Sequence, residues 1–192
     1  APYYIVQIYY KQGRYNEITD YTPEIIDKVT QKRLPEVSRI TADAYARLGK
    51  YPESLHYYKT FLDSSAVVTK EDKYEAGYAF YKAEQYGEAI EILGEISSTD
   101  SELGQNAAYY LADCYVKTGD RTNARLAFKS ASGMSYDPAI QQDALFNYAM
   151  ISYELGSDPF NEAIRAFQEF IDKYPESKRI DEAYRFLIQA YL

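Results

Sequence analysis

Residues 42–61 read ADAYARLGKYPESLHYYKTF, and the same order of small, aromatic and glycine positions recurs through the chain. In this stretch Tyr45 stands four residues before Gly49. The matching pairs elsewhere are Tyr9 with Gly13, Phe80 with Glu84, Tyr115 with Gly119 and Ser152 with Gly156. Successive glycine positions are separated by 36, 35, 35 and 37 residues. Self-similarity at such a period predicts an array of structural repeats.

Each repeat has the pattern of two helices joined at the glycine position. After Gly49 come an aromatic residue at Tyr51, a small residue at Ser54, and large residues at Tyr58 and Phe61. These intervals of three, four and seven residues place the side chains on one face of a helix. Glycine ends a helix readily because it adopts the left-handed conformation of a C-terminal cap. The repeat is therefore expected to be a pair of antiparallel helices.

Capping residues and the repeat register together predict the helices. Asp137-Pro138 and Asp158-Pro159 each put a capping acceptor before a proline of the first turn, which indicates two helix starts. No alternating polar and apolar run or hairpin turn indicates a strand. We therefore expect an all-α chain with helices over residues 2–12, 15–30, 36–48, 51–64, 70–83, 86–98, 102–118, 121–132, 138–155, 160–173 and 178–191.

This pattern resembles the tetratricopeptide repeat (TPR), and the resemblance covers essentially the whole chain. A small residue stands three positions before the Tyr position in four repeats, as Ala42, Gly77, Ala112 and Ala149. The family's first-helix Trp is missing, and Ser157-Asp158 resembles a two-residue insertion. The resemblance implies one right-handed superhelical solenoid domain over residues 1–192. Its repeats are expected at approximately 1–34, 35–69, 70–101, 102–137 and 138–177, with a partial unit at 178–192.

One stretch carries a more specific resemblance. From Ala163 to Ala183 the sequence follows the string A-x3-F-x2-F-x3-Y-P-x-S-x5-A. This string is similar to the repeats of bacterial envelope proteins, such as the lipoprotein of the outer-membrane barrel-assembly machinery and the Tol-Pal-associated coordinator. It predicts a periplasmic or outer-membrane-associated location in a bacterium, with the cytoplasm as the alternative. Because the helix at 178–191 lacks a second helix, we expect the sequence to be part of a longer repeat protein.

Composition argues against several classes of function. The net charge of −8 is spread over both halves of the chain, which disfavours nucleic acid as a partner. No apolar run approaches the 18 or so residues of a membrane span. His56 and Cys114 are the only residues of their types, so a metal site or catalytic triad has little to build from. We expect no metal, no cofactor and no enzymatic activity, and an enzyme would have to use carboxylates or Tyr.

The 23 tyrosines suggest where a partner binds. Most occupy packing positions of the repeat, but the resemblance implies that the first helices line a concave groove. The groove positions transferred by register are Tyr10, Arg39, Asp43, Tyr74, Tyr78, Tyr81, Tyr109, Asp113, Phe146, Met150, Tyr153 and Arg185, with Tyr3, Gln7 and Gln189 at the ends. The Lys and Asn set that clamps a C-terminal carboxylate in some family members is not matched here.

Two functional hypotheses follow from this surface. The first is a non-catalytic protein–protein interaction scaffold, which holds a peptide or protein segment in an aromatic-rich groove, in a bacterial envelope assembly. Tyr suits this role because it presents a large rigid ring and a hydroxyl for hydrogen bonding. The second is a structural spacer or self-associating array without a groove ligand, in which repeat ends stack on other repeats and cover part of the aromatic surface.

Overall fold

The computed structural model describes residues 2–156 and 160–191, and these residues are all-α, with no strand among them. Contacts divide the chain into two compact units, Ala1–Gln85 and Tyr86–Leu192. We call them the N-terminal and C-terminal units and describe each by itself. The predicted solenoid of helix pairs is confirmed, whereas the single domain over 1–192 and the handedness of the superhelix stay predictions.

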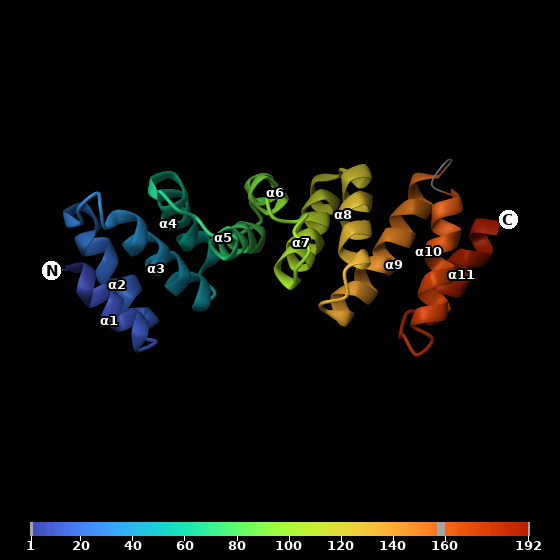
Figure 1. Ribbon diagram of the computed structural model, residues 1–192, viewed down its shortest axis with the longest axis horizontal. Coiled ribbons are helices and arrows are strands. Elements are labelled where there is room, and N and C mark those ends of the chain that lie inside the picture. Colours follow the sequence, from blue (N-terminus) through green and yellow to red (C-terminus); the bar gives the residue numbers. More distant parts are fainter. Residues whose placement is uncertain (1, 157–159, 192) are drawn as a thin grey trace. The chain divides into compact units, whose positions relative to one another are not determined.

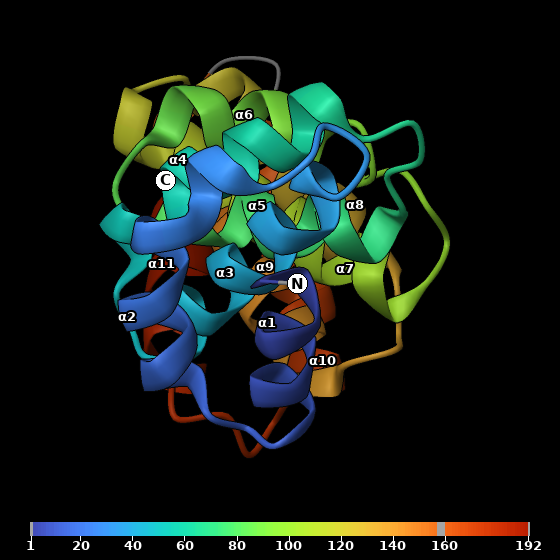
Figure 2. The ribbon, with the colours of Figure 1, turned by 90° about the vertical axis from the view of Figure 1, so that its left-hand side faces the viewer.

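The N-terminal unit consists of antiparallel helices around an apolar core. Its helices are α1 (Pro2–Lys11), α2 (Tyr15–Ile25), the short 3-10 helix η1 (Ile26–Lys28), α3 (Leu34–Arg47), α4 (Tyr51–Ser64) and α5 (Lys70–Lys82). In both ribbon views α1 and α2 lie side by side (Figures 1 and 2). Val6, Ile18 and Val37 have no exposed surface and hold α1, α2 and α3 together.

The C-terminal unit continues the same alternation of first and second helices (Figure 1). Its helices are α6 (Tyr86–Gly94), α7 (Glu102–Thr118), α8 (Arg121–Gly133), α9 (Pro138–Leu155), α10 (Phe160–Lys173) and α11 (Ile180–Tyr191). Each helix packs on the next along the chain. The small residues Ala89, Ala124 and Ala163 are fully buried, as expected where helix axes approach closely.

Most predicted helix boundaries agree with the structure to within two residues. The exceptions are 15–30, whose α-helix stops at Ile25 and continues only as η1, and 86–98, which ends at Gly94. Asp137 caps α9 as predicted, since its carboxylate accepts hydrogen bonds from the backbone N–H groups of Ala139 at 2.8 Å and Ile140 at 3.1 Å. The second predicted cap, Asp158-Pro159, and the proposed insertion Ser157-Asp158 lie outside the described residues.

The turn after each first helix explains the Tyr-to-glycine interval. In the second repeat the N–H of Lys50, just after the glycine, donates to the carbonyl of Tyr45 at 2.9 Å. The same bond recurs at the turns of Gly13, Glu84 and Gly119, always to the residue four before the glycine position. Closing this bond requires positive φ, which costs a residue with a side chain more than it costs glycine. Glu84 is the one non-glycine among the described residues with positive φ, at 61°.

Replacing Glu84 with glycine is expected to stabilise the protein by about 0.5 to 1 kcal/mol. A left-handed non-glycine residue costs about 1 to 2 kcal/mol, and the larger entropy of glycine in the unfolded chain cancels part of the gain. Urea denaturation followed by circular dichroism measures the change. The matched control is Glu91→Gly within α6, which should destabilise by about 1 kcal/mol. A loss of stability in Glu84→Gly would show that this turn is not strained.

Candidate functional site

The candidate groove residues occupy three positions of each first helix, namely six and two residues before the Tyr position and one residue after it. In the N-terminal unit these helices are α1, α3 and α5. All six candidates there are half-buried, so part of each residue is accessible to a partner. They are Tyr10, Arg39, Asp43, Tyr74, Tyr78 and Tyr81.

Three tyrosines form a continuous aromatic row along one face of α5. The ring centroids of Tyr74 and Tyr78 are 6.1 Å apart at an interplanar angle of 19°, and those of Tyr78 and Tyr81 are 6.1 Å apart at 37°. Intervals of four and three residues put these rings on the same side of the helix. We call Tyr74, Tyr78 and Tyr81 the tyrosine row. The ring of Tyr51 meets Tyr78 edge-on at 6.2 Å and supports the row from α4.

A hollow of about 240 Å³ opens beside the tyrosine row, between α3 and α5. It exists because the second repeat has Ala46 at the position one after Tyr45, where the first and third repeats have Tyr10 and Tyr81. The missing ring leaves space next to Tyr78. We call this space the α3–α5 hollow, and its lining residues are Asp43, Ala46, Arg47, Tyr51, Glu75 and Tyr78.

Two carboxylates line the α3–α5 hollow, and they differ in their partners. Asp43 Oδ2 accepts hydrogen bonds from Tyr10 Oη at 2.6 Å and from Arg47 Nε at 2.7 Å. Partial burial and this bond to the carboxylate raise the pKa of Tyr10. Glu75 forms no ion pair with any residue that the structure describes. Desolvation by the walls of the hollow, and then the negative charge of Asp43, raise the pKa of Glu75 although the residue remains accessible to solvent.

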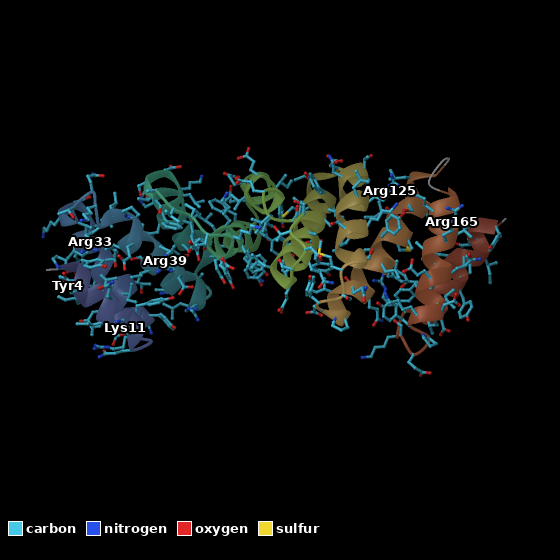
Figure 3. The ribbon with its side chains drawn as sticks, viewed as in Figure 1. Tyr4, Lys11, Arg33, Arg39, Arg125 and Arg165 are labelled. Atoms are coloured by element: carbon cyan, nitrogen blue, oxygen red, sulfur yellow. The ribbon has the colours of Figure 1, made fainter. Side chains whose placement is uncertain are left out.

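Arg39 adds a cationic group to the same face of the N-terminal unit. It projects from α3 one helical turn before Asp43 (Figure 3). Its guanidinium forms no ion pair with a residue of the described ranges, 2–156 and 160–191. The face therefore combines aromatic rings with charges of both signs. This is the arrangement that gives a binding surface both area and orientation.

In the C-terminal unit the candidate Tyr109 serves contacts within the unit. Its hydroxyl donates to Asp143 Oδ2 at 2.6 Å, and its ring packs edge-on against Phe128 with centroids 5.8 Å apart. Partial burial and the bond to Asp143 raise the pKa of Tyr109. Tyr3 and Glu36 form the corresponding pair at the same repeat positions in the N-terminal unit, also at 2.6 Å. Such tyrosines link consecutive first helices.

Phe146 is not a surface residue, so its assignment to the groove is wrong. Its side chain has no exposed area, and its ring contacts Phe170 and Phe167 at centroid distances of 5.1 and 6.0 Å. The guanidinium carbon of Arg179 lies 3.4 Å from the ring centroid and covers the remaining side. The connection between α10 and α11 brings Arg179 there, because Ser177 Oγ accepts a hydrogen bond from Gln142 of α9 at 2.6 Å.

The other candidates of the C-terminal unit do not form a comparable row. The ring of Tyr153 packs against Phe186 at 5.4 Å, and the guanidinium of Arg185 lies 5.5 Å from the centre of the Phe186 ring. Asp113 and Met150 are half-buried on α7 and α9. A groove continuous with the tyrosine row of the other unit stays a prediction.

Residues Arg47, Tyr51 and Glu75 of the hollow were not predicted as site residues. Tyr51 follows the packing pattern of the second helix. Glu75 falls between two groove positions of α5, and Arg47 follows the last groove position of α3. The available signal was Ala46, a small residue at a position that is aromatic in neighbouring repeats. A missing side chain in a regular array predicts a hollow whose lining comes from adjacent positions.

The groups that could support catalysis or metal binding are isolated. His56 is exposed and contacts only the ring of Tyr57 among described aromatic residues, at 5.5 Å. Cys114 is buried, and desolvation raises the pKa of its thiol to about 12, which disfavours the reactive thiolate. Within residues 2–156 and 160–191 no group of three potential ligands could hold a metal ion. In the same part of the chain, no helix combines the length and hydropathy needed to cross a membrane.

Comparisons with known proteins agree with this architecture. The crystal structure of YrrB, a TPR protein with an unusual peptide-binding site, aligns with a TM-score of 0.70 at 14% identity, covering 96% of this chain and 90% of that one. The structure MamA MSR-1 C2 aligns with a TM-score of 0.61 at 19% identity, covering 85% of this chain and 89% of that one. At these identities the likeness shows the fold alone. A comparison with curated protein sequences finds no match.

Family models locate the repeats directly in the sequence. One tetratricopeptide repeat model matches residues 41–93 and 74–138, and a second matches residues 143–177. The first model alone spans more than half of the chain. The paired helices, the recurring turns and these matches show that the chain belongs to the tetratricopeptide repeat family.

Proposed function

We propose that this chain is a non-catalytic scaffold that binds an extended segment of a partner protein along the first helices of its N-terminal unit. The family and fold indicate a protein–protein interaction scaffold in general terms. The tyrosine row carries the more specific proposal, because it places three half-buried rings side by side on one helix face. Such rings supply rigid contact area at low entropic cost.

The surroundings of the tyrosine row favour a peptide over a small apolar ligand. Arg39 and Glu75 provide charged groups without ion-pair partners among the described residues, and the α3–α5 hollow provides a recess. An extended segment alternates side chains with backbone N–H and C=O groups, so it can use rings, charges and tyrosine hydroxyls together. YrrB, which has a similar fold, has a peptide-binding site, and this supports the proposal of a peptide ligand.

We also propose that the partner belongs to a bacterial envelope assembly. The support is the string from Ala163 to Ala183, which resembles the repeats of envelope proteins. In the structure its residues Ala163, Phe167 and Phe170 are core residues of the C-terminal unit. Because these residues are buried, the string supports the proposed location and not a binding site. The proposed binding site is the tyrosine row.

Peptide selection tests the binding proposal directly. A library of random dodecapeptides is panned against the chain, and the affinities of recovered peptides are measured by fluorescence anisotropy. The combined substitutions Tyr74→Ala, Tyr78→Ala and Tyr81→Ala are expected to weaken binding by about tenfold or more, because the loss of one interface hot spot, for which Tyr is a favoured residue, costs about 1.4 kcal/mol or more. Circular dichroism checks that the variant remains folded, and the single variants replace it if it does not.

The matched control removes three exposed tyrosines elsewhere, through Tyr4→Ala, Tyr136→Ala and Tyr184→Ala. It should leave peptide affinity within about twofold. If no peptide is recovered, or if the tyrosine-row variant binds every recovered peptide as tightly as the unmodified chain, the proposal is wrong. Assembly that increases with concentration, measured by analytical ultracentrifugation, would instead favour the self-associating array, for which α11 offers the exposed residues Tyr184, Ile188 and Tyr191.

A further inference from the structure

We propose that the α3–α5 hollow is a subsite for one cationic side chain, Lys or Arg, of the bound segment. This inference rests on the proposed function and adds the chemistry of one position of the partner. The hollow lies directly against Tyr78, the middle ring of the tyrosine row, so a segment lying on the row passes its opening. Its charge, its walls and its size each point to a cation.

The charges that line the hollow leave an excess of negative charge. Asp43 is paired with Arg47 at 2.7 Å, which balances one negative and one positive charge. Glu75 has no ion-pair partner among the described residues, so its carboxylate is the uncompensated group. The raised pKa of Glu75 has the same cause, because partial desolvation and the nearby Asp43 both disfavour its ionised form. A cation at this place would offset the charge of Asp43 and favour the ionised form of Glu75.

The aromatic walls of the hollow also suit a cation. Tyr51 and Tyr78 line it, and the face of a tyrosine ring attracts positive charge. The chain itself uses one of these rings in this way, since Lys82 Nζ lies 5.7 Å from the centre of the Tyr51 ring. An ammonium or guanidinium inside the hollow would therefore meet a carboxylate and ring surface together. An anionic side chain would meet the charge of Glu75 instead.

The size of the hollow suits a single long side chain. Its volume of about 240 Å³ is below the range of about 300 to 1,000 Å³ that holds drug-sized ligands. A long unbranched side chain fits such a recess and brings its charge to the inner wall while its methylene groups pack against rings. Lys and Arg are the side chains that combine this length with positive charge.

A small probe tests the subsite independently of any peptide. The probe is Nα-acetyl-arginine amide, and the neutral control is Nα-acetyl-citrulline amide, which has nearly the same shape. Titration is followed in amide-resolved NMR spectra of the full chain. We expect saturable shifts at residues of α3 and α5 lining the hollow, with a dissociation constant in the millimolar range for a ligand of this size. The citrulline amide should bind at least about fivefold more weakly.

Two variants test whether binding of the arginine amide depends on the carboxylate of Glu75. Glu75→Gln is expected to weaken the arginine amide about fivefold, since it removes the unpaired charge and keeps the shape. The matched control Asp63→Asn removes one negative charge from α4, outside the hollow, and should leave the affinity unchanged. Equal binding of both amides, shifts located elsewhere, or an unchanged affinity in Glu75→Gln would overturn the proposal.

The two proposals fail in distinguishable ways. Selected peptides that bind through the tyrosine row, while the arginine amide leaves the hollow unperturbed, would overturn the cationic subsite and leave the scaffold function standing. Failure to select any peptide would overturn the scaffold function whatever the arginine amide does. Selected peptides that lose about fivefold affinity when one Lys or Arg becomes Gln, and lose nothing further in Glu75→Gln, would support both.

Discussion

Replacing Phe146 with alanine is expected to lower the free energy of unfolding by about 3 to 5 kcal/mol. The ring is fully buried between α9 and α10, where it meets Phe170 and Phe167 edge to face. Its removal leaves a cavity beneath Arg179, whose guanidinium loses the ring that it covers at 3.4 Å. Urea denaturation monitored by far-ultraviolet circular dichroism measures the loss of stability.

The control for this variant is Met150→Ala, one turn further along the same helix. Met150 is only half-buried, so its replacement should cost about 1 to 2 kcal/mol at most. Peptide binding at the tyrosine row should be unaffected in Phe146→Ala molecules that remain folded. A loss below about 1 kcal/mol, combined with reduced peptide affinity, would show that Phe146 acts in the groove as the sequence predicted.

Replacing Gln105 with leucine is expected to cost about 2 to 4 kcal/mol. Gln105 is fully buried, and it fixes the connection between α8 and α9. Its Nε2 donates to the carbonyl of Met134 at 2.7 Å, and its Oε1 accepts from the N–H of Asp137 at 2.7 Å. Leucine fills a similar volume but satisfies neither group, and each buried unsatisfied group costs about 1 to 3 kcal/mol.

Hydrogen exchange at the backbone amide of Asp137 tests this prediction locally. The amide of Asp137 should exchange at least about tenfold faster in Gln105→Leu, because its acceptor is gone. Gln142→Leu is the control, since Gln142 is half-buried and its replacement removes a single hydrogen bond, to Ser177. It should cost about 1 kcal/mol and leave the Asp137 amide protected. Unchanged protection in Gln105→Leu would mean that Gln105 does not hold the connection.

The groove positions show which features of the site the sequence predicts and which it does not. The register placed Tyr74, Tyr78 and Tyr81 on one face of α5, and in the structure the rings of Tyr74 and Tyr81 each lie 6.1 Å from the ring of Tyr78. The same register assigned Phe146 to the groove, where it is buried instead. Both assignments use the same rule, because periodicity fixes the direction in which a side chain leaves its own helix. Periodicity does not predict which other segment of the chain packs over that side chain.

The sequence by itself determined the helices, their pairing and their turns, because these depend on neighbouring residues. The Tyr-to-glycine interval reports a hydrogen bond that closes within one turn, and even the exception Glu84 takes the conformation of the glycine that it replaces. Only the tertiary structure decided which polar groups meet. Arg179 over Phe146, Gln105 beneath the α8–α9 connection and Glu75 beside Asp43 all depend on packing between segments, which the repeat period does not encode.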